Sequence, residues 1–208
     1  MPETLTYQNA ACEATVTVAQ PAADTLHITY RLLNHGPELL YLCNQLPQGP
    51  AGDHGPAPVS AQAAQVQVDA TGVQVLQAIV DVSFREGIRV LDMPYLTPLP
   101  PGQPYAQTIV LPLPLLPAKV RGARPGQSPA ELLPLRVTLG YFVGSPALAP
   151  HLRAVATSLD PAYQLADFMA NAQQLLTVGP FAGAVPVANT SADPAPPPPR
   201  PEEWTPWG

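Results

Sequence analysis

The chain has 208 residues, of which 46% are hydrophobic and only 12% are charged, and its formal net charge is −6. This length fits one large domain with appendages. Thirty prolines and fourteen glycines argue against a helical bundle, because proline removes a helix hydrogen bond and clashes with the preceding turn. Of the nine basic residues, only Lys119, Arg121 and Arg124 come close together, and this is too weak a positive field for a phosphate backbone. We therefore expect no nucleic-acid partner.

The ends and cysteines of the chain indicate a cytoplasmic protein. The N-terminus lacks the basic start and apolar run of a secretory signal, and the longest apolar stretch, residues 109–117, is interrupted by prolines and too short to cross a bilayer. We therefore expect no membrane contact. Cys12 and Cys43 could pair across a sandwich as one disulfide, but without an export signal we expect both to be reduced and buried.

Apolar and polar residues alternate with period two through the first three-quarters of the chain, which predicts strands. Residues 13–19 form the first clear case. In residues 25–33, the predicted inward row is Leu26, Ile28, Tyr30 and Leu32. A turn at Gly36 and Pro37 then leads to a strand over residues 38–46.

The following segment, residues 47–64, has no periodicity and predicts a long loop. Short strand pairs are predicted around Thr71–Gly72 and around Glu86–Gly87. Further strands are predicted over residues 105–113 and 134–144, with a last one after residue 180.

Short strands separated by turn signals predict an all-β fold of two antiparallel sheets packed face to face. The pattern resembles an immunoglobulin-like or fibronectin-like β-sandwich, although the Cys…Trp…Cys spacing of antibody domains is missing. We expect this domain to span residues 1–188.

One segment, residues 161–177, predicts a helix instead. Its apolar stripe has helical spacing, with Asp160 as the N-cap, Pro161 in the first turn and a stop at Gly179–Pro180. The stripe consists of Leu165, Phe168, Met169, Ala172, Leu175 and Leu176. Packing of this helix on the sandwich is the simpler interpretation, and a partner-docking helix is the alternative.

No local motif predicts catalysis or cofactor binding. Ser145 lacks the G-x-S-x-G context, and the two cysteines fall within predicted strands. His54 beside Asp53 is the most accessible metal candidate, but two ligands in a loop are typical of an ordinary solvated turn. We expect no catalytic residue, no metal and no cofactor.

The C-terminal segment, residues 189–208, has the composition of a disordered tail, and its proline run over residues 194–201 favours polyproline II. Both tryptophans of the chain follow this run. We interpret Trp204 and Trp207 as anchors of a linear motif, locally constrained by Pro206 and steered by Glu202 and Glu203. The alternative is that these tryptophans cover an apolar patch of their own domain.

The sequence therefore predicts a non-catalytic interaction module, an adaptor or accessory subunit. Its partner is another protein, a second copy of the chain being one candidate, bound through the terminal EEWTPWG motif. The sandwich face or loop 47–64 would contact a further partner. Two alternatives stay open: a peptidase inhibitor that uses the Pro-rich loop 94–104, and an enzyme whose site is assembled from distant residues.

Overall fold

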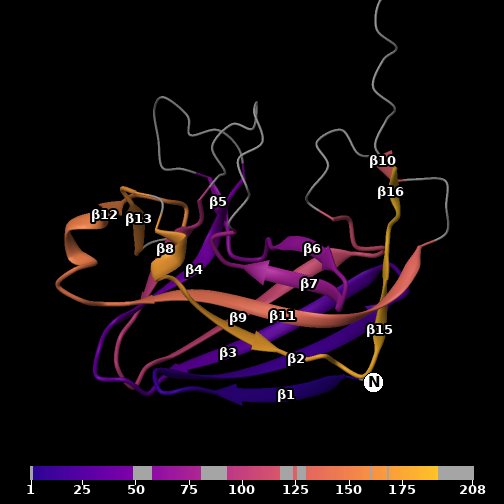
Figure 1. Ribbon diagram of the computed structural model, residues 1–208, viewed down its shortest axis with the longest axis horizontal. Coiled ribbons are helices and arrows are strands. Elements are labelled where there is room, and N and C mark those ends of the chain that lie inside the picture. The colour runs from indigo at the N-terminus through magenta and orange to yellow at the C-terminus, as the bar shows by residue number, and fades with distance from the viewer. Residues whose placement is uncertain are drawn as a thin grey trace, which may run out of the picture.

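The structure, a computed structural model, describes residues 2–48, 58–80, 93–117, 124–125, 130–159, 161–167 and 169–191. These residues form an all-β fold with two short 3₁₀ turns (Figure 1). The strands are β1 (Glu3–Gln8), β2 (Cys12–Ala22), β3 (Thr25–Asn34), β4 (Leu40–Pro47), β5 (Val59–Ser60), β6 (Gln65–Asp69), β7 (Gly72–Gln77), β8 (Tyr95–Leu99), β9 (Pro104–Pro112), β10 (Arg124–Pro125), β11 (Glu131–Val143), β12 (Leu152–Val155), β13 (Ala162–Leu165), β14 (Gln174–Val178), β15 (Ala184–Val187) and β16 (Thr190–Ser191). The turns are η1 (Ala149–His151) and η2 (Ala170–Ala172).

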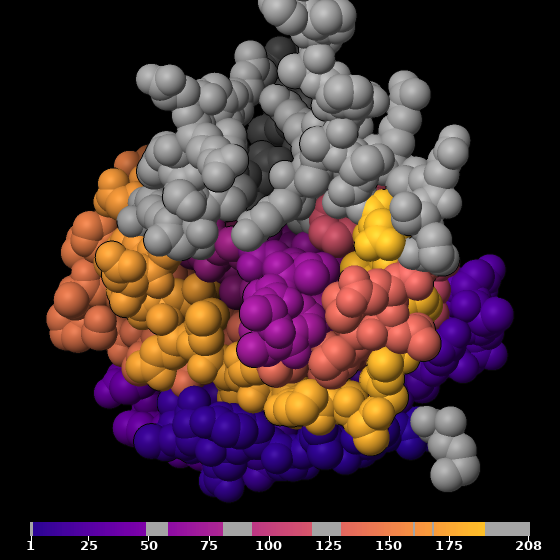
Figure 2. Space-filling model, turned by 45° about the vertical axis from the view of Figure 1, so that its right-hand side comes forward, coloured from indigo at the N-terminus to yellow at the C-terminus, as the bar shows by residue number. Residues whose placement is uncertain are grey.

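Two main sheets pack against each other. The small sheet has the order β1-β2-β3-β9, and the large sheet follows β12-β13-β8-β4-β11-β7-β6, with β14 and β15 paired to β11 and β5 paired to β4. Figure 2 shows the indigo strands of the small sheet as a layer below the magenta, orange and yellow segments. The predicted all-β class is confirmed, but the pairing is mixed, because β7 runs parallel to β11.

The predicted inward rows fill the space between the sheets. Leu26, Ile28, Tyr30 and Leu32 are all buried in the main core, as the alternation along β3 predicts. Cys12 belongs to this main core, whereas Cys43 belongs to a second cluster that contains Phe142 and Leu165. Both cysteines are free and buried, as predicted, and their places in separate clusters keep them apart.

The predicted helix over residues 161–177 is wrong. This segment forms β13, η2 and β14, because pairing of β14 with β11 places Leu176 and Val178 in the main core. A helix would instead bury Leu175, which is 56% exposed. The apolar residues of β13, η2 and β14 happen to recur at three- and four-residue intervals, but pairing with distant strands determines the structure of this segment. Asp160 and Phe168 lie outside the described residues.

The long loop predicted over residues 47–64 is partly described. Val59 and Ser60 form β5, which pairs with the end of β4, and residues 49–57 lie outside the described part, as do residues 81–92 around the predicted turn at Glu86–Gly87. None of the described helices is long and apolar enough to span a membrane.

Candidate functional site

The residues that the sequence singles out for partner binding cannot be placed. Glu202, Glu203, Trp204, Pro206 and Trp207 lie outside the described residues. The described chain reaches them through β16, which pairs with β10.

A surface hollow of about 320 Å³ lies at one end of the sandwich. It forms where the β1–β2 turn, the β3–β4 turn and the ends of β11 and β14 meet. It is lined by Asn9, Ala10, Ala11, Gly36, Pro37, Glu38, Leu40, Val143 and Gln174. Its walls are mostly apolar, with polar side chains from Asn9, Glu38 and Gln174.

Hydrogen bonds lock the rim of the hollow. The Asn9 side-chain oxygen accepts from the backbone N–H groups of Ala11 and Cys12, both at 2.9 Å. The Ala11 carbonyl in turn accepts from the N–H groups of His35 and Gly36, at 2.9 and 3.1 Å. These bonds hold the β1–β2 turn and the β3–β4 turn together.

A chain of polar side chains lies behind this rim. Asn9 Nδ2 donates to the Tyr141 hydroxyl at 2.9 Å, and this hydroxyl donates to Gln174 Oε1 at 2.7 Å. Desolvation by burial raises the pKa of Tyr141 to about 12 and also raises the pKa of the Cys12 thiol. Both groups therefore keep their protons at neutral pH, and the Tyr141 hydroxyl serves as a buried, neutral link between Asn9 and Gln174.

The sequence analysis did not identify this cluster, because Asn9, Tyr141 and Gln174 come from three distant segments. One local signal was present: an asparagine directly after a strand commonly hydrogen-bonds the following backbone and forms a turn. This signal marks Asn9 as a turn residue, but nothing local connects it to Tyr141.

The shortest histidine–carboxylate contact in the described part of the chain is exposed. His151 Nδ1 lies 2.8 Å from Asp167 Oδ2, and their side chains are 37% and 65% exposed. Among the described residues, no hydroxyl or thiol is hydrogen-bonded to this ring, so the pair lacks the nucleophile of a catalytic triad. Nor do the described residues hold a group of three or more potential metal ligands; Asp53 and His54 lie outside them.

The Pro-rich loop proposed for a peptidase inhibitor is mostly regular structure. Residues 95–99 form β8, which pairs with β4 and β13, and β9 begins at Pro104. Asn34 holds the connecting turn, because its Nδ2 donates to the Leu99 carbonyl and its backbone carbonyl accepts from Gly102. Only the exposed turn over residues 100–103 remains available to a protease cleft.

Comparison with known proteins places the chain in no group: no protein-family model, no curated protein and no solved structure matches it.

Proposed function

We propose that the chain is a non-catalytic protein-interaction module that docks a partner through its terminal EEWTPWG motif. The observation that carries this proposal is the composition of the core. Among the described residues, the main core is built from side chains between Cys12 and Val187 in the sequence. Its largest side chains are already fully buried without either tryptophan. Two tryptophans that follow a proline run in the sequence favour association with another surface.

The arrangement of polar groups supports binding over chemistry. The histidine–aspartate pair is solvated, and the Asn9 and Gln174 side chains that line the hollow are neutral amides. The polyproline segment would hold the motif away from the domain at about 3.1 Å per residue.

Affinity capture from an extract of the source organism tests the proposal. The baits are the full-length chain, a version truncated after Ala188 and the Trp204→Ala/Trp207→Ala double variant. We expect a partner that only the full-length chain retains and that a synthetic peptide of residues 199–208 elutes. A matched peptide with both tryptophans replaced by alanine serves as the control. Equal capture by all three baits would contradict the proposal.

We also propose that the two sheets form an immunoglobulin-like sandwich in a cytoplasmic protein. The antiparallel small sheet, packed on a larger sheet around one main core, supports the first part. The reduced, buried cysteines agree with the second.

A further inference from the structure

One edge of β11 is left open at the end of the strand. Tyr141 pairs with Gln174 of β14 on one side and with Leu42 of β4 on the other, so these two strands lie on opposite edges of β11. Val143, the last residue of β11, lies two residues beyond the point where β14 begins. No described strand therefore covers the β14 edge at Val143.

The backbone groups of Val143 point to this open edge. The Gly144 N–H donates to the Leu39 carbonyl at 2.7 Å, so the even-numbered residues at this end of β11 bond to β4. The odd-numbered residues bond to the opposite edge, where Tyr141 is paired with Gln174. The N–H and C=O of Val143 therefore face the open edge, where no described strand pairs with them, and Val143 also lines the hollow of about 320 Å³.

A carboxylate and an amide also line the hollow. Glu38 is exposed and belongs to the β3–β4 turn, and its carboxylate forms no ion pair with the other described residues. Gln174 Oε1 accepts from the Tyr141 hydroxyl, so the Nε2 group of this amide remains as a donor. Glu38 is the only charged residue in the lining, so the ligand charge that complements the hollow is positive.

We propose that this hollow binds an extended segment of a partner protein that carries a basic side chain. The segment continues the line of β14 along β11, and its N–H and C=O bond to the C=O and N–H of Val143. Its basic group binds the Glu38 carboxylate, and an apolar side chain on the same face packs against Ala11 and Pro37. The net charge of −6 favours the approach of a basic partner.

The open backbone at Val143 favours a peptide over a small organic cation. A free ammonium ion can neutralise Glu38, but it offers no acceptor for the Val143 N–H. A peptide backbone supplies a donor and an acceptor together, at the spacing of a paired strand. The volume of about 320 Å³ is at the lower end of the range of about 300–1,000 Å³ for ligand pockets, so only a few residues can enter.

Two blocked peptides, acetyl-AVAKA-amide and acetyl-AVAEA-amide, test the proposal in NMR titrations of the isotope-labelled full-length chain. In each peptide the valine and the charged residue lie on one face of an extended segment, so only the sign of the charge differs. We expect the lysine peptide to bind about tenfold more tightly than the glutamate peptide. It should shift the signals of the Val143 backbone amide and the Gln174 side-chain amide, and it should slow hydrogen exchange of the Val143 amide.

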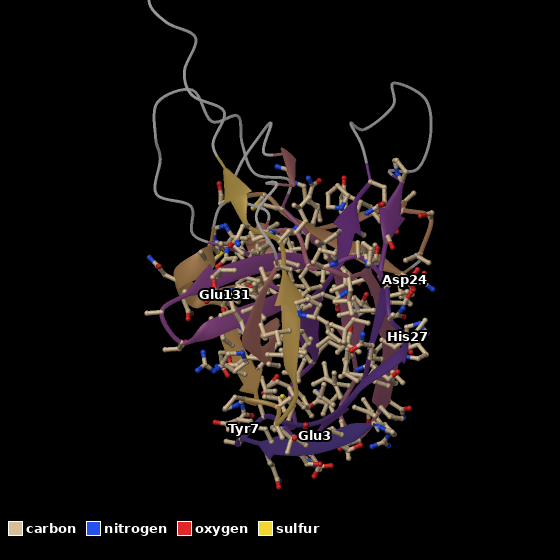
Figure 3. All side chains as sticks on the ribbon, turned by 90° about the vertical axis from the view of Figure 1, so that its right-hand side faces the viewer. Glu3, Tyr7, Asp24, His27 and Glu131 are labelled. Atoms are coloured by element: carbon tan, nitrogen blue, oxygen red, sulfur yellow. The ribbon has the colours of Figure 1, made fainter. Side chains whose placement is uncertain are left out.

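Glu38→Gln is the decisive variant, and Glu131→Gln, which changes an exposed glutamate at the opposite end of β11, is its matched control. In Figure 3, Glu131 lies well apart from Tyr7, which is two residues before Asn9 in the lining of the hollow. We expect Glu38→Gln to weaken binding of the lysine peptide about fivefold and the control to leave it unchanged.

Three results would each overturn the proposal: equal affinity for the two peptides, equal effects of the two variants, or titrations that leave the Val143 and Gln174 signals unshifted. The terminal tryptophans take no part in this site. Failure here therefore leaves the capture experiment unaffected, so the two proposals can be separated.

Discussion

Replacement of Gln77 by Met tests whether buried polar contacts hold the two sheets together. Gln77 is 1% exposed and lies at the end of β7. Its Oε1 accepts from the Tyr30 hydroxyl at 2.7 Å, and its Nε2 donates to the carbonyls of Ala61 and Ala63 at 2.7 and 2.8 Å. One side chain thus connects the large sheet, the small sheet and the segment after β5.

Methionine has a similar length but makes none of these bonds. The Tyr30 hydroxyl and the Ala61 carbonyl are then left unpaired in the interior, at about 1–3 kcal/mol each. The Ala63 residue is half-buried, so water can replace that bond at little cost. Added apolar burial offsets part of the loss, and we expect the free energy of unfolding to fall by about 3 kcal/mol.

Urea denaturation followed by circular dichroism measures this change. Gln74→Met, on the same strand but outside the core clusters, is the control and should stay within about 0.5 kcal/mol of the parent chain. A Tyr30→Phe/Gln77→Met double variant should recover about 1 kcal/mol relative to the sum of the single losses. If Gln77→Met costs no more than the control, the reasoning is refuted.

Two further results are expected. Gly72→Ala should lower the free energy of unfolding by more than about 3 kcal/mol, because φ is +136° and the new Cβ would meet the Pro134 carbonyl oxygen. Gly102→Ala, where φ is +70° and the surrounding space is open, should lower it by about 1 kcal/mol. Urea denaturation compares the two variants. Stability should also fall as the pH rises from about 10 towards 12. The pKa of Tyr141 is raised to about 12 in the folded chain, so in this pH window the unfolded chain releases a proton that the folded chain keeps. The urea midpoint should therefore decrease between about pH 10 and 12. In the Tyr141→Phe variant this decrease should be smaller.

The features predicted correctly from the sequence are those fixed by local geometry. Side chains of a strand alternate between its two faces, so the inward row of β3 could be assigned without knowing its neighbours. The turn predicted around Thr71–Gly72 is also present: it joins β6 to β7, and Gly72, the first residue of β7, adopts a positive φ that glycine tolerates readily.

The features missed depend on pairing between distant segments. The stretch that forms β14 has helical spacing, and only its antiparallel partner β11 makes it a strand. The parallel contact of β7 with β11 has no local signature either. The hollow was unpredictable for the same reason, since Asn9 and Tyr141 meet across 132 residues of sequence.

The edges of the small sheet bear on how this domain can bind another chain. Two backbone hydrogen bonds fix the pairing pattern of β3 with β9: the Leu113 N–H donates to the Asp24 carbonyl, and the Asn34 N–H donates to the Gln103 carbonyl. The odd-numbered residues of β9 therefore form the backbone hydrogen bonds to β3. The backbone groups of Ala106 and Thr108 therefore point to the free edge, where β9 has no further neighbour among the described strands.

This free edge is poorly suited to strand addition. Pro104 and Pro112 bound it and have no N–H to donate, and Gln107 Nε2 already donates to the Thr108 carbonyl at 3.1 Å. At the opposite edge, β1 is tied to the large-sheet side, because the Glu3 carboxylate accepts from the Ala182 N–H at 2.8 Å. The prolines at the ends of β9 and the Glu3 contact of β1 therefore both disfavour the addition of a further strand, so contacts to this sheet are more readily made through side-chain surfaces.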